Sequence, residues 1–137
     1  MSTLALNKPR AYEEGEFNDL PAIVTDIIYE GSAVGLSSGY ARPLVAGDAF
    51  QGFAVKKCDN SAGAAGDKNV RVRKVGEIEI DVTGVTGVTD VGSTVYASDD
   101  DTFTLASTSN SSIGKIVRYV SGTTVVVHFE AAGKRSI

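Results

Sequence analysis

An alternation of apolar and charged side chains over residues 70–82, interrupted only at residues 74–76, constrains the fold of this 137-residue chain more than any other feature. The apolar parity holds Val70, Val72, Ile78, Ile80 and Val82, and the charged parity holds Arg71, Arg73, Glu77, Glu79 and Asp81. Because successive side chains of a β-strand point to opposite faces, the pattern predicts one buried and one solvated face. It fits one long strand bent near residues 74–76, or two short strands.

Weaker alternation and turn residues predict further strands. We expect them at residues 23–30, 49–57, 94–97, 102–105, 113–120 and 123–130, with hairpin turns at 98–101 and 121–122. The glycine- and serine-rich residues 34–43 are predicted to be a connection, and residues 60–68 a flexible loop. About seven short strands predict an all-β fold. It is either a small, jelly-roll-like antiparallel β-sandwich or a partly open barrel.

Composition supports one folded β domain, which we place at residues 21–130. The chain has 42% hydrophobic and 22% charged residues, enough apolar side chains for a core. Residues 1–20 lack alternation and are predicted to form an extended N-terminal arm. The anchors for a partner would be Leu4, Leu6, Tyr12 and Phe17, and a frayed terminus is the alternative. Residues 131–137 are predicted to be a loose tail.

Charge and hydropathy disfavour several classes of partner. The net charge is −4, which argues against nucleic acid as the main partner, because phosphate binding needs a dominant cationic surface. A membrane span needs about 18 consecutive apolar residues, a run that the sequence lacks. We also expect no signal peptide. The single cysteine, Cys58, excludes an internal disulfide and fits a reducing cytoplasm.

Residue types suited to catalysis or metal binding do not form a recognisable pattern. His128 is the only histidine, and alternation places it on the polar face of the last predicted strand. Cys58 has no second cysteine to resolve an oxidised form. Asp99, Asp100 and Asp101 are consecutive, whereas calcium loops space their ligands, so a polar turn is predicted. We therefore expect no enzymatic activity, no metal and no cofactor.

The charges of residues 70–82 suggest self-association. Arg71 and Arg73 lie at one end of the polar stripe, and Glu77 and Glu79 lie at the other. Two copies meeting antiparallel about a two-fold axis near Val75 would pair each arginine with a glutamate, as an isologous dimer requires. The alternatives are a solvated face or ion pairs with another strand of the same chain.

Residues 29–129 resemble the head decoration, or cement, proteins of tailed phages. The resemblance rests on GYARPL at 39–44, GDAFQGFA at 47–54, VYASDD at 95–100, IG at 113–114 and VSGT at 120–123. It implies a structural protein without catalytic residues, made in the bacterial cytoplasm and placed on the outer surface of the virion head. Its implied partners are the major capsid protein and itself, as a dimer or a trimer.

In such a protein the arm would be the first capsid contact and residues 39–44 the second. Tyr40 and Arg42 are residue types enriched at interfaces. The alternative function is a phage or bacterial surface module that binds carbohydrate or a host receptor. The chain has five tyrosines, five phenylalanines and no tryptophan, mostly at strand-like positions, which disfavours an aromatic binding platform.

Overall fold

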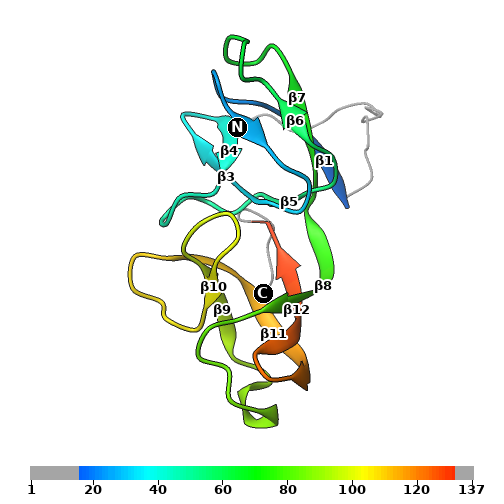
Figure 1. Cartoon of the computed structure of the whole chain (residues 1–137), viewed down its shortest axis with the longest axis vertical. Coiled ribbons are helices and arrows are strands. Elements are labelled where there is room, and N and C mark those ends of the chain that lie inside the picture. The colour runs from blue at the N-terminus through cyan, green and yellow to red at the C-terminus, as the bar shows by residue number, and fades with distance from the viewer. Residues whose placement is uncertain (1–15, 132–137) are drawn as a thin grey trace, which may run out of the picture.

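The computed structural model describes residues 16–131, which form an all-β sandwich of two antiparallel five-stranded sheets (Figure 1). Sheet 1 contains β1 (Phe17–Pro21), β3 (Ala33–Ser37), β4 (Tyr40–Pro43), β5 (Gly52–Ala54) and β7 (Asn69–Arg73). Sheet 2 contains β8 (Val75–Asp81), β9 (Thr94–Ala97), β10 (Phe103–Thr104), β11 (Ser111–Ser121) and β12 (Thr124–Glu130). A ribbon of β2 (Ile27–Ile28) and β6 (Cys58–Asp59) and a 3₁₀ turn, η1 (Val88–Asp90), complete the elements. The all-β class is confirmed. The sequence predicted a sandwich or a partly open barrel, and the structure has features of both, because the two sheets pack as a sandwich and each sheet is itself curled.

The two sheets share one topology. In each, the strands lie side by side in the order first, fifth, fourth, second, third, counted along the chain. A parallel bridge then joins the residues after the first strand to the third strand, Ala22 to Ala41 in sheet 1 and Thr83 to Thr104 in sheet 2. Because these strands lie at opposite edges, each sheet must curl into a partly open barrel. We call these barrels unit 1 (residues 16–74) and unit 2 (residues 75–131).

The correspondence between the units extends to single backbone hydrogen bonds. The amide of Gly31 donates to the carbonyl of Ala54 at 2.8 Å, and the amide of Gly92 donates to the carbonyl of Ile116 at 2.8 Å. Both glycines have positive φ, 88° and 93°, a conformation that other residues rarely adopt. Each of these hydrogen bonds joins the turn before the second strand of a sheet to the fourth strand of that sheet. The two units therefore share one backbone framework.

A second pair of glycines lets the fourth and fifth strands approach closely. Gly52 lies opposite Val34 in unit 1, and Gly114 lies opposite Val95 in unit 2. A Cβ at either glycine would collide with a backbone carbonyl of the fifth strand. Glycine is therefore required at both positions for steric reasons.

The two barrels are filled differently. Unit 1 has alanine at three interior positions where unit 2 has larger side chains; the matched pairs are Ala22 and Val82, Ala41 and Phe103, and Ala54 and Ile116. The remaining space in unit 1 is filled by Ile28 and Cys58 from the β2–β6 ribbon, which are 1% and 6% exposed. The β2–β6 ribbon thus fills space in the core of unit 1, whereas larger side chains fill the corresponding space in unit 2.

Aromatic side chains join the two units. Phe53 of β5 points out of unit 1 and packs on Phe103 and Phe129 of unit 2, with ring centroids 5.9 and 4.9 Å apart. Such tilted and edge-to-face pairs add about 0.5–1.5 kcal/mol beyond the burial of their area. The carbonyl of Asp100 also accepts the amide of Ala33 at 2.9 Å. This junction makes one shared core from strands of both sheets.

For residues 70–82, the second of the two predicted alternatives, two short strands, is observed: β7 lies in sheet 1 and β8 lies in sheet 2. Two other predicted elements differ from the observed ones. Residues 34–43, predicted to be a connection, are largely the β3–β4 hairpin, and of residues 23–30 only Ile27–Ile28 is a strand. The glycines of residues 34–43 suggested a connection, but Gly35 lies within a strand. Glycine is needed there because a Cβ would collide with the Asp48 side chain.

The predicted arm and tail boundaries also differ from the structure. β1 begins at Phe17 and pairs along its whole length with β7, so residues 17–20 belong to sheet 1 and not to an arm. At the other end, Ala131 is buried, and its amide donates to the carbonyl of Lys74 at 2.7 Å. It therefore belongs to the folded domain.

Candidate functional site

Of the four predicted arm anchors, Leu4, Leu6 and Tyr12 lie outside the described residues. Phe17 is part of β1 and lies under the guanidinium groups of Arg71 and Arg73, 4.8 and 5.4 Å from its ring centroid. These cation–π contacts hold the edge strand β1 against β7. The structure therefore gives Phe17 a role within the domain, in contrast to the predicted role as an anchor of the arm on a partner.

The two predicted interface residues of β4 differ in availability. Arg42 forms a bidentate ion pair with Asp48, with Nε to Oδ2 at 3.0 Å and Nη2 to Oδ1 at 2.8 Å. Burial opposes ionisation of Asp48, but the bonds from Arg42 and the Val45 amide outweigh it and lower the pKa of this carboxyl. Arg42 is thus engaged within the chain, while the partly exposed Tyr40 lies beside Gly66 and remains accessible.

The predicted pairing of residues 70–82 with a second copy does not fit the structure. β7 lies between β1 and β5, so neither of its edges is open to another chain. Arg71 pairs with Asp19 at 3.3 Å, and Arg73 pairs with Glu16 at 3.6 Å. Both arginines are therefore paired within the same chain, Arg71 with a residue of β1 and Arg73 with the residue just before β1.

Glu77 and Glu79 have a different environment. They are exposed on β8, which is an edge strand of sheet 2. Within residues 16–131, neither carboxylate forms an ion pair. The structure therefore separates the two halves of the predicted self-association site: the arginines are satisfied, and the glutamates are not.

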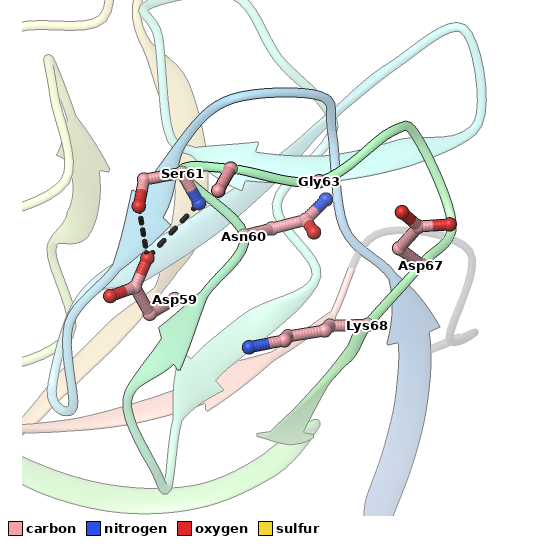
Figure 2. A pocket seen from close by; sticks show the side chains of 7 residues that line it. Asp59, Asn60, Ser61, Gly63, Asp67 and Lys68 are labelled. Carbon is pink, nitrogen blue, oxygen red and sulfur yellow. Dashed lines mark hydrogen bonds between the residues drawn. The ribbon is translucent and has the colours of Figure 1, made fainter.

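A cavity of about 300 Å³ lies beside the connection between β5 and β7 (Figure 2). Its lining includes Asp59, Asn60, Ser61, Gly63, Asp67 and Lys68. Figure 2 shows Ser61 bonded to Asp59 on one side of the cavity, with Asp67 and Lys68 on the other. Hydrogen bonds from the Ser61 side chain and backbone lower the pKa of the Asp59 carboxyl.

Asn60 fastens this connection to the rest of unit 1. The side chain is 1% exposed, and its Nδ2 donates to the carbonyls of Ile23 at 2.9 Å and Ala64 at 3.0 Å. Its Oδ1 has no partner among the described residues and is packed against Gly63, where a Cβ would collide with it. The oxygen presents no surface to a ligand, so Asn60 is a structural residue of the cavity wall.

The remaining cavity wall offers two carboxylates, a hydroxyl and one ammonium group. These groups can hydrogen-bond a small polar molecule. The cavity lining includes neither a histidine nor an aromatic side chain.

His128 lies where the alternation predicted, and the structure places Cys58 in the interior. Cys58 is buried in the unit 1 core, where burial raises the pKa of its thiol and disfavours the reactive thiolate. His128 is half-exposed on the outer face of β12, and its Nε2 lies 3.4 Å from Oε1 of Glu130.

The three aspartates form the predicted turn between β9 and β10, but they also contribute to the unit junction. Asp99 accepts the amide of Asp101 at 2.8 Å and the hydroxyl of Thr102 at 3.1 Å, and these bonds lower its pKa. Burial, followed by the neighbouring charge of Asp99, raises the pKa of Asp100. Within residues 16–131, no three His, Cys, Asp or Glu side chains converge as metal ligands.

Comparison of the chain with protein-family models, with curated proteins and with solved structures finds no match. In the part of the chain that the structure describes, no helix has the length and apolar character needed to cross a bilayer.

Proposed function

We propose that this protein is a decoration protein of a phage head, which binds the outer surface of the assembled shell and stabilises contacts between major capsid protein subunits. The observation that carries the proposal is the order and spacing of the five sequence segments that resemble decoration proteins. The all-β fold agrees with that resemblance. The described residues show no catalytic grouping that would favour an enzyme.

Two of the resembling segments lie where the units meet. Residues 47–54 supply Asp48, which supports the β3–β4 hairpin, and Phe53, which joins the units. Residues 95–100 supply Asp100, whose carbonyl bonds the first residue of β3. The segments that resemble decoration proteins therefore include residues that fix the two-unit architecture of this chain.

The physical mechanism of such a protein is linkage. A ligand that binds the expanded shell and not the precursor shell stabilises the expanded form by its binding free energy. Repetition of the contact over the lattice multiplies a modest affinity per site. This mechanism requires binding alone and no chemical step.

We propose that residues 1–15 and the turn before Tyr40 contact the capsid. Because β1 begins at Phe17, deletion of residues 2–15 leaves every strand of unit 1 intact. The truncated protein should keep its urea midpoint and lose shell binding. Full binding by the truncated protein would exclude the arm, including Leu4, Leu6 and Tyr12, and would leave the turn to be tested with Tyr40→Ala.

The direct test of the proposed function is co-sedimentation with shells. The purified protein is mixed with expanded, undecorated heads of its phage, and unexpanded proheads serve as the control. Saturable binding to the expanded form alone is expected. Absence of binding to both forms would refute the decoration function.

The cavity of Figure 2 favours a second candidate, a surface module that binds carbohydrate. Hydroxyl-rich ligands are recognised by carboxylates and hydroxyls such as those of Asp59, Ser61 and Asp67. A glycan array tests this function, with Asp59→Ala/Asp67→Ala as the matched variant. Glycan binding by the parent protein that the variant loses would favour this function over capsid decoration.

A further inference from the structure

The outer face of unit 2 carries three columns of side chains, one on each of three neighbouring strands. The edge strand β8 presents an acidic column, Glu77, Glu79 and Asp81. The middle strand β12 presents His128, Val126 and Thr124. The third strand β11 presents a basic column, Lys115 and Arg118. This face therefore has one acidic border and one basic border.

Strand register aligns the charges in rows. The first row is Glu77, His128 and Lys115, and the second is Glu79, Val126 and Arg118. A bulge at Val117, where the register shifts, brings Arg118 to the same face as Lys115. Neighbouring strands lie about 4.8 Å apart, so the acidic and basic columns are separated by about 10 Å.

The charges of the two columns are not neutralised within the described chain. Glu77, Glu79, Lys115 and Arg118 are all exposed, and none forms an ion pair within residues 16–131. The middle strand keeps the columns too far apart for direct contact. Arg71 and Arg73 of unit 1, by contrast, each have an acidic partner in the same chain.

We propose that a second copy of this chain docks on this face, about a two-fold axis that runs along β12. Rotation by 180° about this axis leaves each row at the same height along β12. It places the acidic column of one copy opposite the basic column of the other. Glu77 of one copy then faces Lys115 of the other, and Glu79 faces Arg118, so four ion pairs form across the interface. Val126, already buried, and the half-exposed His128 lie along the axis. This arrangement has the self-complementarity of an isologous dimer.

Charge excludes the simpler alternative of pairing through the open edge of β8. Two antiparallel copies of β8 would bring Glu77, Glu79 and Asp81 of one chain against the same acids of the other. Like charges placed opposite one another destabilise strand pairing. The glutamates are therefore expected to reach the basic column of the partner's face and not its edge.

The expected dimer is weak and depends on salt. The face is the convex outside of a small barrel and is only three strands wide, which places the buried area at or below the low end of specific interfaces. Exposed ion pairs are screened, and at 1 M salt the Debye length is only about 3 Å. The dimer should form in dilute salt and dissociate in 1 M NaCl. Purified protein without capsids tests it, so its failure is distinct from failure of the proposed function.

Two charge-reversal variants test the dimer sharply. Lys115→Glu/Arg118→Glu makes both borders acidic, and Glu77→Lys/Glu79→Lys makes both basic. Sedimentation velocity in 50 mM NaCl should show each variant alone to associate at least tenfold more weakly than the parent, about 1.4 kcal/mol. An equimolar mixture of the two should form a heterodimer, because each acidic column then faces a basic one.

The matched control is Lys56→Glu/Lys57→Glu, which makes the same change in net charge as Lys115→Glu/Arg118→Glu but on exposed residues of unit 1. It should dimerise as the parent does. A parent protein that is monomeric at all concentrations, or trimeric, would overturn the proposal. So would a mixture of the two reversed variants that fails to associate, or a reversed variant that dimerises normally. Circular dichroism of each variant verifies folding, and the two reversals test the face independently.

Discussion

Units 1 and 2 are the same barrel with different outer faces. Phe53 of unit 1 and Lys115 of unit 2 occupy matching positions of the fourth strand. Each directly follows one of the two matched glycines, Gly52 and Gly114. Phe53 is 5% exposed and packs on unit 2, whereas Lys115 is exposed. One frame can therefore present a face that stacks on another barrel or a face that remains in solvent. The residue at the outward-facing position decides between these two outcomes.

The connection between the fourth and fifth strands shows a second difference. In unit 1 it comprises residues 55–68 and supplies Cys58 to the core, whereas in unit 2 it is the tight turn of residues 122–123. The cavity of Figure 2 lies beside the longer connection. The longer segment compensates for the small alanines inside unit 1, and it also gives that unit a concave surface that the tight turn cannot form.

The junction residue should give the largest contrast between the units. Phe53→Ala is expected to lower the free energy of unfolding by about 3–5 kcal/mol, because it removes a large buried side chain. Lys115→Ala, at the matched position, should change it by less than about 0.5 kcal/mol. Urea denaturation at low protein concentration measures both. A small effect of Phe53→Ala would show that the aromatic cluster does not stabilise the junction.

The paired glycines should behave alike if the units share one frame. Gly52→Ala and Gly114→Ala are each expected to destabilise by about 1–3 kcal/mol or more, since the new Cβ meets a backbone carbonyl. Gly87→Ala is the control, because its surroundings are open and its φ of 169° is ordinary extended backbone. Thermal and urea unfolding measure the effects. Tolerance of alanine at one position alone would break the correspondence.

The Arg42–Asp48 ion pair supports unit 1 and should give it a pH dependence. Asp48→Asn is expected to cost about 1.5–3 kcal/mol at pH 7, the range for hydrogen bonds to charged groups. The folded pKa of Asp48 is lowered, so its contribution is present above the unfolded value of about 3.9 and is lost as pH falls through the folded pKa. Unfolding curves from pH 7 to pH 2 should show the parent and the variant converge in acid. A constant difference would contradict the lowered pKa.

The first strands should differ least. Phe17→Ala removes two cation–π contacts and is expected to cost about 1–2 kcal/mol, whereas Glu77→Ala, its match in unit 2, should cost less than about 0.5 kcal/mol. Hydrogen exchange of the β1 amides, together with urea unfolding, measures the loss. Unchanged protection of β1 would show that strand pairing alone holds this edge.

The repeat itself has only a faint trace in the sequence. GSAV at residues 31–34 and GSTV at 92–95 mark the matched turns that begin the second strands, each with a positive-φ glycine. The rest differs, because a β frame requires only the right parity and a few glycines, and many side chains satisfy those conditions. The hairpins at 94–105 and 111–130 were predictable from local alternation and turns; the equivalence of the two barrels was not.

The candidate surfaces were predictable only in part. Alternation correctly placed Glu77 and Glu79 on an outward face, but it paired them with Arg71 and Arg73, which face β1 of the same chain. Lys115 and Arg118 were missed because strict alternation places residues 115 and 118 on opposite faces. The bulge at Val117 that unites them is visible only in the register with β12.

The sequence by itself determined the β class, the parity of the buried positions and the last two hairpins, because these follow from contacts between residues close in the chain. Only the tertiary structure decided that residues 70–82 divide between two sheets, that Phe53 joins the barrels, and that the arginines are neutralised while the glutamates stay exposed. These outcomes depend on pairing between distant segments. Alternation of side chains with a period of two residues identifies the buried face of a strand, but it does not identify the strands that pair with it.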